Sequence, residues 1–242
     1  MLTKGKAQPP SRPRRFYTTA SVGTVGEGFS VLLDGRAVKT PSGMTLVLPV
    51  AALAQEVAAE WGAQGEEIVF AEMPLTRIAF TAVDRIGKVR AAVAEDLALR
   101  IGSDLLCYYA EGPAPLIERE LAHWGPMLDW AEAELGLTLE RASGIVHRQQ
   151  PAQTLERVRA LALELDDFAI TGLASAASLF GSVVLAFALQ RGELSADAAF
   201  DLSHLDEAFQ QEQWGVDDEA AARTAGMRRE AVAYGRWFKA LG

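Results

Sequence analysis

The side chains most able to do chemistry are three histidines, His123, His147 and His204, and one cysteine, Cys107. Metal ligands of these types recur at short, fixed spacings, and a nucleophilic thiol needs a neighbour that lowers its pKa. The four residues fall in different predicted elements and have none of those spacings between them. The sequence therefore predicts no metal site, no catalytic thiol and no cofactor.

Adjacent acids occur at Glu66-Glu67, Asp166-Asp167 and Asp217-Asp218. Adjacent residues on a helix point in different directions, so such pairs are weak candidates for acid–base catalysis. We expect solvated carboxylates, with Asp167 and Asp217 suited to cap helices. An enzyme with a dispersed active site stays open as the alternative function.

The stretch "VGTVGEG" holds three glycines, Gly23, Gly26 and Gly28, at a density typical of phosphate-binding loops. Such loops need a strand before them and a helix after them, so that helix N–H groups meet the phosphate. Here a β-rich run follows instead, which indicates a turn. No GKS or GKT sequence is present, so nothing indicates nucleotide hydrolysis.

The stretch "SHLDEAFQQEQWG", residues 203–215, reads as helix, but its tryptophan lies off the apolar stripe. That stripe consists of Leu202, Leu205 and Phe209. At about 100° per residue, Trp214 lies about 130° away, beside Glu207 and Gln210. Either Trp214 packs against a second helix or it contacts a partner, since tryptophan is common at protein interfaces.

The elements that position these residues change character along the chain. Residues 16–48 predict a β-meander, in which Asp34-Gly35 supplies the positive φ angles of a tight hairpin. A further short strand is predicted in "DLLCYYA". Apolar spacing and helix-end signals predict helices over 50–62, 74–101 with an interruption at Gly87, 115–135, 151–165, 167–190, 195–214 and 217–239.

This order predicts an α+β protein with two domains. Residues 1–95 are expected to form a small N-terminal domain with an antiparallel β-sheet and helices. Residues 96–242 are expected to form a C-terminal all-helical domain, and the join lies between Ile86 and Gly112.

The net charge of −9 makes nucleic acid an unsuitable partner, because an acidic surface repels phosphate. Basic residues gather before the first acid, where we expect a flexible tail: Lys4, Lys6, Arg12, Arg14 and Arg15. No apolar stretch follows them, so they are not a secretory signal. A lone cysteine rules out an internal disulfide and fits a reducing compartment.

Residues 170–189 carry no charge over a length that could span a membrane. Small and hydroxyl residues such as Thr171, Gly172 and Ser175 dilute its apolar character. We therefore predict a buried helix of a soluble bundle, with no membrane insertion. Membrane association through this segment is the rival interpretation.

Seven segments in order resemble a known family: "RRFYTTASV", "GFSVLLDGRAVKTP", "LAQEVAAEWGAQGEEI", "MPLTRIAFTAVD", "SDLLCYYAEGP", "HWGPMLDWA" and "LDEAFQQEQWGVDDEA". They look like the F-type ATP synthase assembly chaperones that bind the alpha subunit of the catalytic sector. That family occurs in mitochondria and alphaproteobacteria. The resemblance runs from about Arg15 to Ala220.

The resemblance implies a two-part fold, no catalysis, and a monomer that holds unassembled alpha subunit until the beta subunit covers the same surface. It implies that Glu207 occupies the family's acidic position, with Asp206, Gln210 and Trp214 beside it in the partner-binding site. The short basic leader favours bacterial cytoplasm, with the mitochondrial matrix as the alternative.

Overall fold

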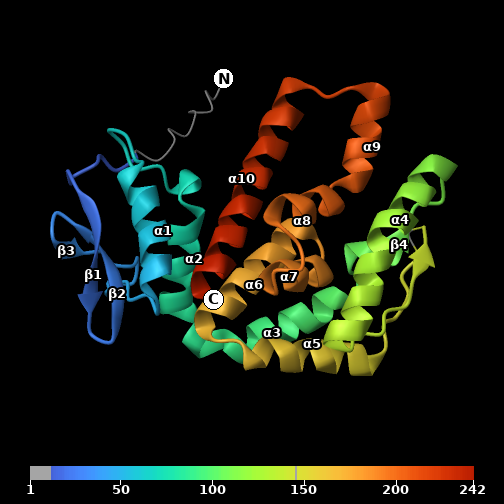
Figure 1. Ribbon diagram of the computed structural model, residues 1–242, viewed down its shortest axis with the longest axis horizontal. Helices are drawn as coiled ribbons and strands as arrows, with labels where there is room; N and C mark the ends of the chain where they lie inside the picture. The colour runs from blue at the N-terminus through green and yellow to red at the C-terminus, as the bar shows by residue number, and fades with distance from the viewer. Residues whose placement is uncertain (1–11, 145) are drawn as a thin grey trace, which may run out of the picture.

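The computed structural model describes residues 12–144 and 146–242 (Figure 1). Lys4 and Lys6, which the sequence places in a flexible basic tail, lie outside these residues. Arg15 of the same basic group is well anchored. Its guanidinium donates hydrogen bonds to the backbone carbonyls of Gln64, Tyr17 and Thr18, and it stacks over the Tyr17 ring at 4.7 Å.

The N-terminal part is a three-stranded antiparallel sheet in the order β1 (Ala20–Val25), β2 (Gly28–Leu33), β3 (Arg36–Ala37). Asp34 and Gly35 have φ angles of 47° and 81°, so the predicted hairpin is confirmed. Asp34 also accepts hydrogen bonds from the backbone of Thr18 and Thr19. The predicted glycine turn is confirmed at Gly26, which joins β1 to β2 with φ 59°.

One helix, α1 (Ala51–Gly62), covers a face of the sheet (Figure 1). Its apolar residues Leu53 and Val57 are fully buried, and so is Val31 of β2. The Trp61 side chain is also buried, and its carbonyl accepts a hydrogen bond from the Tyr17 hydroxyl at 2.7 Å. Trp61 is therefore a core residue of the N-terminal part.

The helix α2 (Pro74–Thr81) follows a short 3-10 turn, η1 (Phe70–Glu72), and begins on the carboxylate of Glu60. Glu60 comes from α1 and accepts hydrogen bonds at 2.8 Å from the backbone N–H groups of Leu75 and Thr76 and from the Thr76 hydroxyl. An acceptor at this place satisfies N–H groups that have no partner within the helix. Glu60 thus fixes α2 on α1.

The chain then stays helical through η2 (Ala82–Ile86) into α3 (Gly87–Ile101). The predicted interruption at Gly87 is wrong, because η2 is a π-helical turn that leads into α3 while Gly87 keeps a right-handed φ of −53°. The predicted boundary between residues 95 and 96 falls inside α3. The division into domains 1–95 and 96–242 stays a prediction.

The connection to the next helix contains η3 (Leu105–Cys107) and β4 (Tyr108–Tyr109), which pairs in parallel with β5 (Ala142–Ser143). The strand predicted in "DLLCYYA" is thus two residues long. The helix α4 (Ala114–Trp130) continues through the π-helical turn η4 (Ala131–Leu135), and α5 (Ala152–Glu164) packs against α3.

The single helix predicted over 167–190 is two helices, α6 (Asp167–Phe180) and α7 (Val183–Gln190). Gly181 adopts φ 64° between them, and the Ser182 hydroxyl caps α7 by accepting the Leu185 N–H at 3.0 Å. Seven of the eight α7 residues are buried, so the buried reading is confirmed. Within the described residues, no helix combines the length and apolarity needed to cross a bilayer.

The helix predicted over 195–214 is also two, α8 (Ala196–Ser203) and α9 (Leu205–Trp214). His204 breaks it with φ −121°. The last helix, α10 (Asp218–Leu241), is capped by Asp217 as predicted and packs on α6 and α8. Its Trp237 is fully buried and donates a hydrogen bond to the Phe168 carbonyl at 3.1 Å.

Candidate functional site

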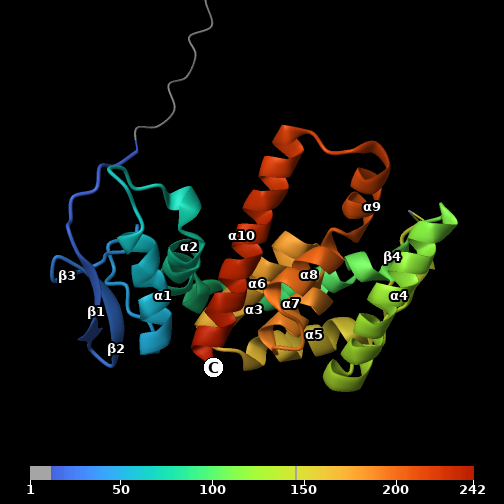
Figure 2. The ribbon, with the colours of Figure 1, turned by 45° about the horizontal axis from the view of Figure 1, so that its top comes forward.

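The helix α9 lies beside α4, at the end of the molecule away from the sheet (Figures 1 and 2). Arg119 of α4 donates two hydrogen bonds to Glu212 of α9, at 2.8 and 2.9 Å. The same guanidinium stacks over the ring of Phe209 at 5.1 Å. Two parallel hydrogen bonds and a stacked ring fix both the rotation and the height of α9 on α4.

The end of α8, just before α9, is held by a tryptophan of α4. Trp124 is 1% exposed, and its indole N–H donates to the Leu202 carbonyl of α8 at 3.0 Å. Trp124 therefore belongs to the core, as does Trp61.

Three of the four predicted partner-binding residues share the outer face of α9. Glu207, Gln210 and Trp214 stand at helical positions i, i+3 and i+7, and all three are exposed. Trp214 is 80% exposed, so it does not pack against a second helix. Val216, which follows it in the loop to α10, is 52% exposed. An exposed indole next to an exposed valine is typical of an interaction site.

The fourth predicted residue, Asp206, points the other way. It is half-buried against Glu120 of α4, which is fully buried. Burial, followed by the nearby charge of Glu207, raises the pKa of Asp206. Asp206 therefore contributes to the attachment of α9 and does not belong to its outer face.

Sequence reasoning missed Glu120 and Arg119. A signal for Glu120 was present, since Leu116, Glu120 and Trp124 lie four residues apart on one buried stripe of α4. An acid on an apolar stripe is expected to have a specific partner. The sequence holds no comparable signal for the contact of Arg119 with Glu212.

The residues first considered for chemistry do not meet. His123 and His147 are exposed, and His204 lies 2.8 Å from the Ser203 hydroxyl through Nδ1. Cys107 is fully buried, and burial raises the pKa of its thiol. No three potential ligands among histidine, cysteine and the acids gather in the described part of the chain.

The acid pairs behave as solvated groups and caps. Asp166, and not Asp167, caps α6 by accepting the N–H groups of Phe168 and Ala169. Asp167 forms an ion pair with Arg90 at 3.1 Å instead. The expected role of Asp167 as a cap is thus wrong by one residue, because the acid with extended backbone geometry precedes the helix.

A separate groove of about 1130 Å³ lies between α1, η1 and residues 223–236 of α10. Its walls include Arg223, Arg229 and Glu72, together with small apolar residues. It lies on the sheet side of α10, so it is distinct from the outer face of α9.

Comparisons with known proteins identify the family to which this chain belongs. A family model described as "ATP12 chaperone protein" matches residues 14–132. The crystal structure of Atp12 from Paracoccus denitrificans superimposes with a TM-score of 0.86 at 36% identity, covering 95% of this chain and 99% of that one. The chain belongs to the ATP12 chaperone family.

Two further similar proteins support the same family. A mutant form of Paracoccus denitrificans Atp12p also matches with a TM-score of 0.86 and 36% identity, over 96% of this chain and all of that one. The mitochondrial protein atp12 of Schizosaccharomyces pombe is 26% identical over 220 residues, which is 86% of this chain and 75% of that protein. Membership of the ATP12 family identifies the chain as a chaperone of ATP synthase assembly and confirms the resemblance found in the sequence.

Proposed function

We propose that this ATP12 family member binds the unassembled alpha subunit of the F-type ATP synthase through the outer face of α9. The observation that carries the proposal is Trp214, an indole 80% exposed on a helix that an Arg119–Glu212 ion pair joins to α4. Glu207 and Gln210 stand beside it on the same face. An exposed carboxylate is suited to accept charge-assisted hydrogen bonds from an arginine or from backbone N–H groups of a client.

The physical need for such a holder follows from the assembly itself. A subunit of an alternating ring exposes a large apolar interface before its neighbour arrives, and such surfaces aggregate. In this proposal the chaperone covers that interface as a monomer and leaves when the beta subunit competes for the same surface. This exchange requires no nucleotide and no cofactor. It takes place in bacterial cytoplasm, or in the mitochondrial matrix for a mitochondrial member.

A pull-down with alpha subunit tests this assignment. We expect Trp214→Ala to weaken binding by about 2 kcal/mol, roughly 30-fold in Kd, as removal of a buried interface tryptophan does. Glu207→Lys, which reverses the charge beside it, is expected to abolish capture. Both side chains are exposed, so circular dichroism and thermal melting should match the unaltered protein.

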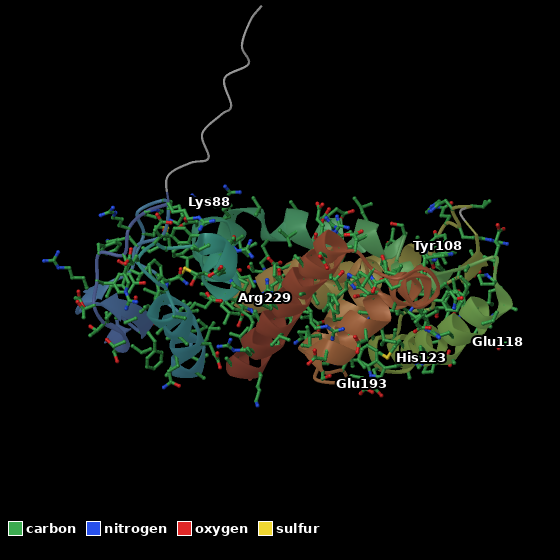
Figure 3. All side chains as sticks on the ribbon, turned by 90° about the horizontal axis from the view of Figure 1, so that it is seen from above. Lys88, Tyr108, Glu118, His123, Glu193 and Arg229 are labelled. Carbon is green, nitrogen blue, oxygen red and sulfur yellow. The ribbon has the colours of Figure 1, made fainter. Side chains whose placement is uncertain are left out.

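The matched control is Glu193→Lys, the same charge reversal at an exposed position between α7 and α8 (Figure 3). It should capture alpha subunit normally. Equal capture by Glu207→Lys and Glu193→Lys, with native circular dichroism for both, would show that the outer face of α9 is not the client site.

A further inference from the structure

The contact between α4 and α9 contains more buried acceptors than donors. Glu120 is fully buried, and its Oε2 accepts the backbone N–H of Ala110 at 2.8 Å. Its other oxygen, Oε1, and Oδ1 of Asp206 are both buried, and neither receives an N–H or O–H from another group in the described residues. Two carboxylates in this position would repel each other in a poorly solvated site.

One proton resolves the conflict. A proton shared by the two carboxyl groups lets one of them donate a hydrogen bond to the other, and burial raises the pKa of both. Since Oε2 of Glu120 already accepts an N–H, Oε1 is the oxygen left to carry the proton and donate it toward Asp206. Each orphaned oxygen then has a partner.

We propose that Glu120 is the positioning residue of α9, which stays docked on α4 while Glu120 and Asp206 share one proton and loosens when that proton leaves. The inference rests on the proposed function only in treating α9 as the client helix. The regulation it adds is that mildly acidic pH presents the client face, and a rise to neutral or alkaline pH loosens it.

Neighbouring charges do not take over the role of this proton. Besides Glu120 and Asp206, the titratable or charged groups on the elements packed here lie on α4, on β4, and on or next to α9: Glu118, Arg119, His123, Asp129, Tyr108, Tyr109, His204, Glu207 and Glu212. Arg119 gives both of its hydrogen bonds to Glu212, and Glu207 adds a negative charge beside Asp206. In the described residues, no arginine, lysine or histidine forms an ion pair with Glu120 or Asp206.

The direction of the pH effect follows from the pKa. Burial and the neighbouring Asp206 raise the pKa of Glu120 from 4.5 to about 7. A carboxyl with a raised pKa in the docked state stabilises that state at low pH, and the contribution is lost as pH rises through the docked pKa. The loss therefore falls between about pH 4.5 and pH 7 and is complete above it.

Amide hydrogen exchange of the full chain, without client, measures the docking directly. We expect the protection of α9, corrected for the intrinsic exchange rate, to fall by up to about tenfold between pH 6 and pH 8, because one proton is released. The protection of the buried helix α7 should not change over this range. A flat profile for α9 would overturn the proposal.

Two variants separate the shared proton from simple packing. In Glu120→Gln the amide oxygen can accept the Ala110 N–H and the amide N–H can donate to Asp206 at every pH, so α9 should stay protected at pH 8. The control, Glu118→Gln, removes the same charge from an exposed position at the outer edge of α4 (Figure 3). It should keep the tenfold change of the unaltered protein. If Glu120→Gln keeps that change too, the proton is elsewhere and the proposal fails. Because no alpha subunit is present, this result is independent of the pull-down.

Discussion

Replacing Asp104 by alanine is expected to lower the free energy of unfolding by about 4 kcal/mol, since three buried N–H groups lose their acceptor. Asp104 is fully buried before η3. Its carboxylate accepts the N–H groups of Val183 and Val184 at 2.7 and 3.1 Å, and that of Leu106 at 3.2 Å. The first two belong to the start of α7, where a helix also favours a negative charge.

Urea unfolding followed by circular dichroism measures this loss. Asp104→Asn is the informative comparison, because asparagine keeps one acceptor oxygen at nearly the same volume. It should lose about half as much as Asp104→Ala. A loss below about 1 kcal/mol for Asp104→Ala would mean that water replaces the carboxylate and that the cap of α7 is not essential.

Glu60→Ala is expected to cost about 3 kcal/mol, for a related reason. The carboxylate accepts two backbone N–H groups and one hydroxyl at the start of α2, and all three groups lie in the buried region between α1 and α2. Burial raises the pKa of Glu60, so removing the side chain also removes a desolvated acid, which offsets part of the loss.

The matched control is Glu66→Ala, which removes an exposed carboxylate from the chain segment just after α1 and should change stability by less than about 0.5 kcal/mol. Thermal melting of Glu60→Ala and Glu66→Ala measures the stability that each variant loses. Folded Glu60→Ala should still capture alpha subunit, because α9 lies at the other end of the molecule. Equal melting temperatures for the two variants would contradict the role given to Glu60.

The parts of the fold that local rules determine were predictable. Asp34-Gly35 predicted its hairpin, because few other dipeptides accept two positive φ angles. The outer face of α9 was predictable too, since Glu207, Gln210 and Trp214 share a face of any helix. Asp206 does not share that face, because a step of one residue turns a side chain by about 100°.

The errors in the helices come from contacts between distant segments. At the break between α6 and α7, the carboxylate of Asp104 accepts the N–H of Val183. No local sequence pattern predicts that contact, because the two residues are far apart in the chain. His204 separates α8 from α9, and the sequence has no glycine or proline there to predict the break. The shared proton of Glu120 and Asp206 depends on α4 meeting α9, which only tertiary structure provides.

The unbroken helical path from Pro74 to Ile101 has a mechanical consequence. The chain passes from the sheet into the helical part through α2, η2 and α3, and changes direction at η2 (Figure 1). Because helix continues through the whole connection, we expect the sheet and the helical part to move together when a client departs.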